Sequence, residues 1–520
     1  MDGIIFRCSS RSMRLVFLAA LVVATTIVNL SPKKILSRRR RRRLQHLDPK
    51  TIEEKEVGIH RDAIVEDSVD RVRLPIYTQE NIELTAKHFY MASVPRILVF
   101  DGENFQLYNL EHKSTLYVKK SGGWRSNQAI PLLVNALKEI DPDRFQPGQP
   151  PFQLLYTDGD CLASKICHEK KCPVDQFAPF LVFGSVPMDD TRFPSVQAFP
   201  NAHFIDCLER WKLKGRRGAC KWGPIPNPEE KHPEFQQLKN QIVWRGTLNN
   251  FLGTEPEFLP TNDFLSFQDF LFKEVSDGNT YDSLISTKEP RNWARINPRM
   301  RAVIMTLEDE FLRQNPQQQY PGLSSLLSKD PWIDAKFPGE GGLNMRKAFQ
   351  QKGLNVTGEY MSPMVQMNYK YLIDFGGGGG TTWKGTIDKL NLPGLLMHHE
   401  TSMKDWYFEL LKPMVNCLPV AWDLSNLKDQ YIWAEDHPEE AKKIAEEGTK
   451  LGNYLLSEEY MSKLYNDLFV KYLKEVLTAY HPLSNNEQDS WSTLKSRYEN
   501  NGYRLTLITA CEPNCRIIVK

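Results

Sequence analysis

Five consecutive glycines, Gly376–Gly380, constrain the fold of this chain more than any other feature of its sequence. They follow Lys370–Phe375, an apolar segment with the composition of a β-strand, and they precede Thr381–Lys384, which is compatible with a helix start. Glycine tolerates positive φ and lets backbone approach a ligand closely, so N–H groups there can face a phosphate. The pattern predicts an anion-binding turn, with a flexible glycine linker as the alternative.

Several residues of this turn are candidates for contact with an anion. They are Gly377, Gly378, Gly379, Thr381, Thr382 and Lys384. Lys384 offers charge to a diphosphate, and either threonine can cap a helix or donate a hydrogen bond. The segment is not a Walker A loop, because no Gly-Lys-Ser/Thr follows, and its glycines lack the spacing of the dinucleotide-binding fingerprint.

The sequence after the glycine run resembles that of a known family. The similar segments are Leu395–Glu400, Trp406–Pro413, Leu418–Val420 and Asp423–Leu427. They occur in the same order in the C-terminal half of the protein O-glucosyltransferases, which belong to glycosyltransferase family 90 together with capsule-associated xylosyltransferases. Upstream, Val243–Thr247 is similar to the aromatic-Arg-Gly-Ser/Thr motif of that family.

This resemblance implies an enzyme of the GT-B type, in which two Rossmann-like α/β domains hold a donor between them. It implies UDP-glucose or UDP-xylose as the donor, inversion at the anomeric carbon, and no metal or cofactor. It also implies roles for single residues: Ser185 beside the nucleotide, and Arg245 with Lys384 on the diphosphate. Lys384 stands where the family usually has arginine, and lysine lacks the bidentate fork of a guanidinium.

An aspartate after the predicted strand Phe152–Tyr156 is the implied general base. Asp160 aligns best with the base of the family, and a shift of two residues selects Asp158 instead. The alternatives are an Asp-x-Asp site for Mn²⁺ or Mg²⁺ made by both carboxylates, or a simple Asp-Gly turn. A catalytically inactive glycan-binding protein of the same fold is the non-enzyme alternative.

Composition and periodicity predict a globular α/β body. The chain has 520 residues, of which 41% are hydrophobic and 11% aromatic. Its net charge is only +2, so the body as a whole lacks the excess of basic residues that is typical of nucleic-acid-binding proteins. We expect an N-terminal domain at residues 74–240, a donor-binding domain at 241–480 and a tail at 481–520.

The predicted strands are 96–100, 114–118, 152–156, 180–185, 241–244, 370–375, 395–399 and 416–420. The predicted helices are 128–140, 300–313, one ending at 348–352, 383–390, 424–433, 438–455 and 457–480; irregular segments are expected at 192–200, 211–226 and 315–341.

The N-terminal region predicts entry into the secretory pathway. We expect a cytoplasmic tail at residues 1–14, an uncharged apolar signal-anchor or signal peptide at 15–30, and a basic and charged stalk at 31–73. The run Arg38–Arg43 conflicts with this orientation, because positive flanks usually stay in the cytoplasm. We expect a single-pass Golgi or endoplasmic reticulum membrane protein with a luminal body, because long domains translocate despite flanking charge.

Cysteines and one sequon agree with a luminal body. One of the nine cysteines, Cys8, precedes the apolar segment, and the eight that follow it suit disulfides. The cluster Cys161, Cys167 and Cys172 suggests zinc, but its spacing matches no strong zinc pattern, so disulfide-linked loops are favoured. Asn355-Val356-Thr357 is a glycosylation sequon.

His398 and His399 are adjacent on a predicted strand. We expect one of them to be buried and the other exposed, because neighbours on a strand face opposite sides.

Overall fold

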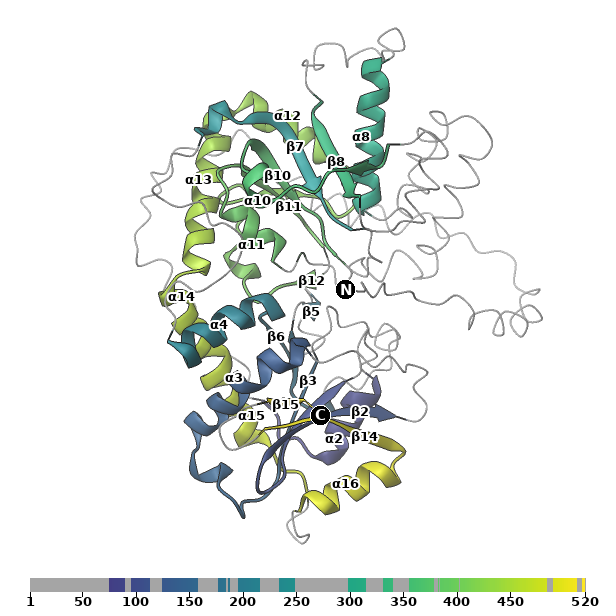
Figure 1. Ribbon diagram of the computed structural model, residues 1–520, viewed down its shortest axis with the longest axis vertical. Coiled ribbons are helices and arrows are strands. Elements are labelled where there is room, and N and C mark those ends of the chain that lie inside the picture. Colours follow the sequence, from purple (N-terminus) through teal and green to yellow (C-terminus); the bar gives the residue numbers. More distant parts are fainter. Residues whose placement is uncertain are drawn as a thin grey trace, which may run out of the picture. The chain divides into compact units, whose positions relative to one another are not determined.

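Two β-sheets organise the described part of the chain in the computed structural model (Figure 1). Residues 1–71 and 72–520 form two separate units, and every described residue belongs to the second unit. The structure describes residues 74–88, 95–112, 124–157, 176–183, 186–187, 195–215, 233–247, 298–314, 331–339, 355–377, 382, 384–401, 403–483, 490–511 and 517–519.

The sheet in the second half of the chain is parallel throughout its described strands. Its strands are β7 (Lys239–Arg245), β8 (Ile333–Pro338), β9 (Thr357–Gly358), β10 (Tyr369–Asp374), β11 (Leu395–His399) and β13 (Leu418–Val420). Read from β9, the order β9-β8-β7-β10-β11-β13 is 3-2-1-4-5-6 along the chain, which is the order of the Rossmann fold. The order reverses between β7 and β10, so the switch point of the sheet lies at the carboxyl ends of these two strands.

Helices cover both faces of this parallel sheet (Figure 1). Side chains on one face, such as Ile373 and Met397, share a core cluster with α8 (Pro298–Gln314) and α12 (Leu427–Asp436). Leu396 points to the other face, because side chains alternate along a strand, and belongs to the cluster that includes α11 (Gly385–Leu390). The alternation of strands and covering helices confirms the predicted α/β class for this half.

Helix α13 (Pro438–Leu455) approaches the end of α11 closely. Proline at its first position and glutamates in its first turn favour the helix start. A Cβ on Gly448 would lie 2.8 Å from the Asn416 carbonyl oxygen, and a Cβ on Gly452 would lie 2.8 Å from the Leu390 carbonyl carbon. Glycine at both positions therefore lets the α13 backbone approach the C-terminal end of α11 and the loop that precedes β13.

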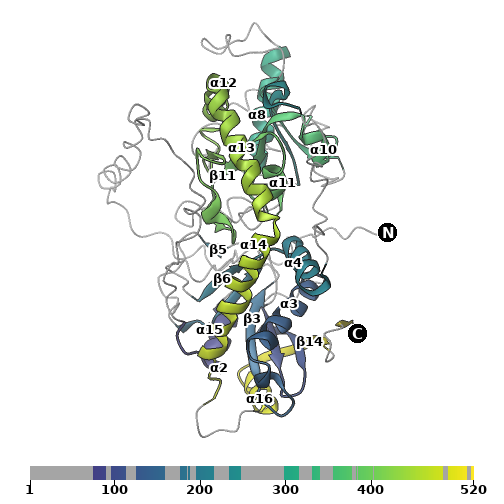
Figure 2. The ribbon, with the colours of Figure 1, turned by 90° about the vertical axis from the view of Figure 1, so that its left-hand side faces the viewer.

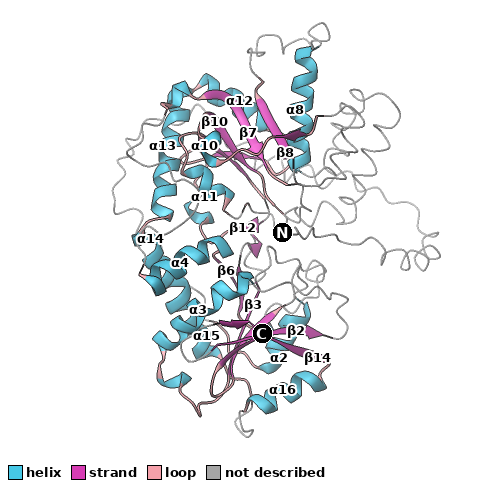
Figure 3. Cartoon of the chain, in the orientation of Figure 1, coloured by secondary structure: helices cyan, strands magenta, loops and turns pink. Residues whose placement is uncertain are grey.

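The first sheet is mixed, unlike the second. Its strands follow the order β15-β14-β2-β1-β3-β4-β6. The β3–β4 and β4–β6 pairs are parallel, and the other described pairs are antiparallel. The strands are β1 (Arg96–Phe100), β2 (Phe105–His112), β3 (Phe152–Thr157), β4 (Phe180–Phe183), β6 (Val196–Phe199), β14 (Tyr503–Cys511) and β15 (Ile517–Val519). Figure 3 shows these strands with the helices around them, including α2 (Gln79–His88), α3 (Trp124–Ile140), α4 (Ala202–Lys214) and α16 (Trp491–Asn500).

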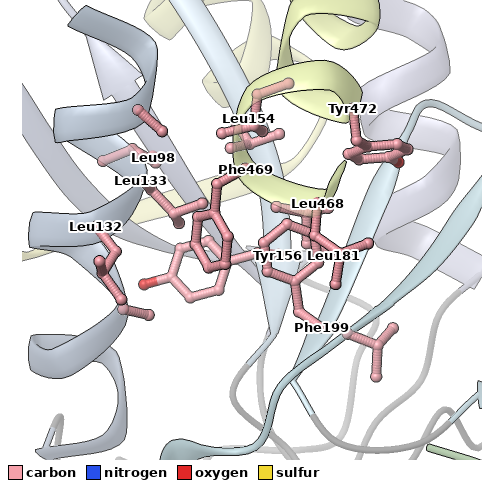
Figure 4. Packing of buried hydrophobic residues seen from close by; sticks show 14 of the residues in the cluster. Leu98, Leu132, Leu133, Leu154, Tyr156, Leu181, Phe199, Leu468, Phe469 and Tyr472 are labelled. Atoms are coloured by element: carbon pink, nitrogen blue, oxygen red, sulfur yellow. The ribbon is translucent and has the colours of Figure 1, made fainter. Parts of the chain in front are cut away.

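The C-terminal part of the chain returns to the first sheet. Figure 2 shows α13 followed by α14 (Glu458–Leu464), which continues through a π-helical segment (Tyr465–Lys471) into α15 (Tyr472–Ala479). Phe469 packs edge-to-face on Phe199 with ring centroids 4.8 Å apart, inside the core drawn in Figure 4. The predicted tail at 481–520 must be corrected, because α16 and β14 lie within it and β14 pairs with β2 along eight register partners.

Three segments expected to be irregular contain regular structure. Strand β6 lies within 192–200, the last turn of α4 within 211–226, and β8 within 315–341. Helix α4 is stabilised by local signals, because the Asn201 side chain accepts the His203 and Phe204 N–H groups and Gly215 ends the helix at φ 56°. The two strands form through pairing with β4 and β7, which local composition does not reveal.

Other predictions fall outside the described ranges. These are the strand at 114–118, the helix end at 348–352, the cysteines at 161, 167 and 172, and the apolar segment 15–30. Within the described residues no helix is long and apolar enough to cross a membrane. Cys207 is disulfide-bonded, whereas Cys417 is a buried free thiol, so the eight cysteines do not all pair. Asn355 of the sequon is exposed.

Candidate functional site

The carboxyl ends of β10 and β11 bring a buried carboxylate and an imidazole together. Asp374 is the last residue of β10, and its Cα register partner on β11 is His398. Both side chains therefore lie on the same face of the sheet, and His398 Nδ1 is 2.8 Å from Asp374 Oδ2. Because ligands of parallel α/β sheets bind at the carboxyl edge beside the switch point, this pair marks the candidate site.

The Asp374 carboxylate is buried and accepts hydrogen bonds from three neighbouring groups. Besides His398, its carboxylate accepts the Thr386 hydroxyl at 2.6 Å and the His399 N–H at 2.9 Å, and the residue is 1% exposed. Burial alone would raise the pKa of Asp374, but the adjacent His398 and these donated hydrogen bonds lower it. Asp374 therefore stays ionised and fixes the orientation of the His398 ring.

The two adjacent histidines have opposite electrostatic surroundings. Burial would lower the pKa of His398, but the Asp374 carboxylate, helped by Glu400 and Asp405, raises it above the ordinary value. Burial lowers the pKa of His399 to about 4. His399 is therefore neutral; its Nδ1 accepts the Gly376 N–H at 3.1 Å, and its Nε2 donates to the Trp422 carbonyl at 2.9 Å. The prediction of one buried histidine holds for His399, while the side chain of His398 is only 18% exposed.

A pocket with a mixed lining lies against this pair. Its enclosed volume is about 10 Å³, room for about one water molecule, and it opens to solvent. Its polar lining comes from Thr382, Thr386, His398, His399, Thr401 and Asp405. Its apolar lining comes from Met403, Tyr407, Phe408 and Leu411. The pocket thus joins the end of the glycine run to the segment after β11, which includes β12 (Met403–Lys404) and a 3₁₀ turn (Phe408–Leu410).

The glycine run is only partly described, and its described backbone groups bond within the protein. The N–H of Gly376 donates to His399, and its carbonyl oxygen accepts the Arg299 Nε–H at 3.0 Å. Gly377 is buried, whereas Gly378, Gly379 and Thr381 lie beyond the described part of the run. Their predicted contact with a phosphate stays a prediction.

The helix that follows the glycines is short, and its N-cap residue, Lys384, makes no side-chain cap. Thr382, two residues before that position, accepts the Thr386 N–H with its Oγ1 at 2.9 Å. Helix α11 has only six residues, too few for a large helix dipole. Lys384 is 39% exposed and lies 3.3 Å from Asp388, and the partly buried Lys389 donates to the Gly385 carbonyl at 3.4 Å. Burial lowers the pKa of Lys389 despite the nearby Asp374 and Asp388 carboxylates.

Arg299 is a component of this edge that no sequence motif indicates. It lies at the start of α8, and its guanidinium donates to the carbonyl oxygens of Phe375 (3.1 Å), Gly376 (3.0 Å) and Thr247 (2.6 Å). These carbonyls follow β10 and β7, so Arg299 connects the two strands of the switch point. Burial lowers its pKa to about 10, and it is charged at neutral pH. No motif around Arg299 signals this role, because its partners are backbone atoms.

Arg245 lies at the end of β7, and its side chain donates hydrogen bonds to a carboxylate and to backbone oxygens of the protein. Its guanidinium donates to the Asp334 carboxylate at 2.7 Å and to the backbone oxygens of Asp334, Trp244 and Glu359. Its side chain is 6% exposed, and a Cβ on Gly358 would lie 2.8 Å from its Nε. Its predicted role on a diphosphate stays a prediction, and the structure shows Arg245 joining β7 to β8 and β9.

The predicted base and the predicted nucleotide serine are not among the described residues. Asp158 and Asp160 follow Thr157, the last residue of β3, and Ser185 directly precedes β5 (Val186–Pro187). Strand β5 pairs with β12, and Met403 of β12 lines the pocket. No group of three or more potential metal ligands occurs among the residues that the structure describes.

Comparisons with known proteins place this site within a family region. Residues 345–493 match the sequence model of glycosyl transferase family 90. The chain is 33% identical to Protein O-glucosyltransferase 2 of Danio rerio over 116 residues, which is 21% of this chain and 22% of that protein. It is 31% identical to Protein O-glucosyltransferase 3 of Mus musculus over 283 residues, 52% of this chain and 47% of that protein. The human Protein O-glucosyltransferase 3 is 27% identical over 280 residues, with the same shares covered. The chain therefore matches less than half the length of these relatives.

Proposed function

Residues 345–493 form a region of glycosyl transferase family 90, and on this premise we propose that the protein transfers a sugar from UDP-glucose or UDP-xylose to a hydroxyl group of a protein. A glycan hydroxyl is the alternative acceptor. The proposed donor site is the carboxyl edge of the parallel sheet. The observation that carries the proposal is that the family region contains the glycine run, the Asp374–His398 pair and the adjacent pocket together.

The proposed reaction is a direct displacement with inversion and without a metal. The acceptor oxygen attacks the anomeric carbon, the bond from that carbon to the β-phosphate oxygen breaks, and UDP leaves with the bonding electrons. The proton of the acceptor hydroxyl passes to a carboxylate, for which Asp160 is the first candidate and Asp158 the second. Lys384, Arg245 and the N–H groups of the glycine run are the proposed partners of the diphosphate.

We further propose that the body of the protein acts in the lumen of the secretory pathway. The support comes from the apolar segment 15–30, the cysteine content and the exposed Asn355 of the sequon. The disulfide at Cys207 agrees with an oxidising compartment. In this proposal the N-terminal segment anchors the protein in the Golgi or endoplasmic reticulum membrane, and nucleic acid is not a partner.

A donor screen on the purified protein tests the proposed function. UDP release is measured with UDP-glucose, UDP-xylose and UDP-galactose, with and without EDTA. We expect release from one of the first two donors, unchanged by EDTA, and a loss of about 10²- to 10⁴-fold in Asp160→Asn with donor affinity retained. Loss of activity with EDTA would instead support an Asp-x-Asp metal site. Glycan binding with no release from any donor would support the non-enzyme alternative.

A further inference from the structure

The sequon Asn355-Val356-Thr357 lies at one edge of the parallel sheet, at the start of β9. Asn355 is exposed, Val356 is 1% exposed and Thr357 is half-buried. We propose that Asn355 is the acceptor of an N-linked oligosaccharide, which its side-chain amide receives from a lipid-linked diphosphate donor. This inference rests on the luminal location in the proposed function, and the sugar transfer proposed for the protein itself plays no part in it.

Pairing with β8 fixes the conformation of the sequon in the folded protein. The Phe337 N–H donates to the Val356 carbonyl oxygen at 3.0 Å, and Thr357 is the register partner of Phe337. The Val356 side chain belongs to the core cluster that includes α8, so it anchors the middle residue of the sequon. The buried residue therefore lies between the two residues that the modification requires, and both of these are at least partly exposed.

The surroundings of Asn355 leave room for a bulky group. The Asn355 amide and the Thr357 hydroxyl make no hydrogen bond to another residue that the structure describes. Strand β9 ends the described order of the sheet, so no described strand pairs with its outer side. Gly358 differs, because a Cβ there would lie 2.8 Å from Arg245 Nε. The start of β9 can therefore carry an oligosaccharide, whereas its last residue cannot carry even a methyl group without displacing Arg245.

The modification replaces one N–H bond of the Asn355 amide. A bond forms between Asn355 Nδ2 and the anomeric carbon of the oligosaccharide, and the bond from that carbon to a phosphate oxygen of the donor breaks. The lipid diphosphate leaves with the bonding electrons, and the amide proton passes to a base of the transferring enzyme. The product is a bulky, neutral and solvated group at an exposed position, which the folded protein can hold without burying a polar atom.

Cell-free translation of the full chain with microsomes tests this proposal. Glycans are counted as steps in gel mobility that an endoglycosidase removes. Asn355→Gln removes the acceptor, and Thr357→Val removes the hydroxyl of the sequon but keeps the β-branched shape in β9. Thr357→Ser is the matched control, because it retains a hydroxyl. Comparison with wild type excludes any contribution from Asn29-Leu30-Ser31, the other sequon of the chain. A C-terminal tag with its own sequon reports separately whether the body has entered the lumen.

We expect wild type and Thr357→Ser to carry one glycan more than Asn355→Gln and Thr357→Val, and the tagged protein to carry one more than the untagged protein. Equal glycan counts in wild type, Asn355→Gln and Thr357→Val, with the tag modified, would overturn the inference while the luminal location stands. If the tag also stays unmodified, the proposed luminal location fails and the inference fails with it. A glycan that is lost in Asn355→Gln but kept in Thr357→Val would also overturn it, because the modification would then not depend on the sequon.

Discussion

Each sheet contains a buried polar network, and the two networks differ in what they enclose. In the first sheet, the Gln153 side chain on β3 donates to Gln79 (2.8 Å) and Tyr480 (3.0 Å) and accepts from the Tyr498 hydroxyl (2.7 Å). In the second sheet, Asp374 on β10 accepts three hydrogen bonds, and the three donor residues, Thr386, His398 and His399, all line a pocket.

This difference separates a structural network from a candidate site. The partners of Gln153 come from α2, the end of α15 and α16, so they join segments that are far apart along the chain. Gln153 itself is 0% exposed and is not among the residues that line the pocket beside Asp374. A buried polar group therefore indicates function only when one atom of its network faces space that a ligand can occupy.

The largest effect is expected from removing the centre of the second network. Asp374→Ala leaves His398, Thr386 and the His399 N–H without their acceptor inside the protein. We expect a loss of about 3–5 kcal/mol in the free energy of unfolding, as for a broken buried charge pair, together with loss of donor turnover. Urea denaturation and UDP release measure the two effects. A variant of near-normal stability would show that the network is less coupled than its distances indicate.

Disrupting the Gln153 network of the first sheet is expected to have a smaller effect, limited to the stability of the fold. Gln153→Leu keeps a similar volume but leaves the Tyr480 and Tyr498 hydroxyls without this partner. We expect a loss of about 1–3 kcal/mol in the free energy of unfolding and an unchanged Kd for UDP. Weaker UDP binding by a well-folded Gln153→Leu protein would contradict the division between the two networks.

The pH dependence of stability should depend on His398. Because its pKa is raised in the folded protein, His398 stabilises the fold fully below the ordinary histidine value, and this stabilisation is lost as the pH rises through the raised pKa. His399 acts in the opposite sense: its pKa of about 4 gives stability that is lost as the pH falls towards that value. The difference in unfolding free energy between wild type and His398→Gln should therefore be largest near pH 6 and shrink towards pH 9. A difference that grows with pH would reverse the assigned direction.

The smallest stability effect is expected at Lys384. Its contact with Asp388 is an exposed pair at i and i+4, worth about 0.3–0.5 kcal/mol, so Lys384→Ala should unfold almost like wild type. If Lys384 contacts the diphosphate, the Kd for UDP should rise about tenfold or more. Lys412→Ala, an exposed lysine after the pocket segment, is the control. Unchanged UDP affinity in Lys384→Ala would leave the phosphate contacts to other groups.

The sequence predicted the strands and helices of the second sheet better than it predicted the contacts between side chains of the candidate site. The apolar runs at β7, β10 and β11 were strong local signals, and α13 was predicted with its observed bounds. Asp374 and His398 were both within predicted strands, but their pairing needs the register of two parallel strands. An aspartate at the end of a buried strand was the available signal, because a buried charge requires a partner.

The remaining errors have a common physical cause. Strand β14 pairs with β2 almost 400 residues earlier in the chain, and β8 depends on β7, so neither is specified by nearby residues. Arg299 and Arg245 donate hydrogen bonds to backbone carbonyl oxygens. Every residue has a backbone carbonyl, so the amino-acid sequence does not show which carbonyls will be the partners. Only the three-dimensional arrangement shows that Arg245 joins three strands while Arg299 connects both strands of the switch point.

Hydrogen exchange measured by mass spectrometry, with and without saturating UDP-sugar, tests most directly whether the second sheet edge is the donor site. We expect slower exchange in peptides that cover residues 374–386 and 398–408 when UDP-glucose or UDP-xylose is bound. Peptides of β3 and α16, which hold the Gln153 network, should exchange at the same rate in both conditions. Protection of β3 and α16 without protection of the β10 and β11 ends would contradict the account.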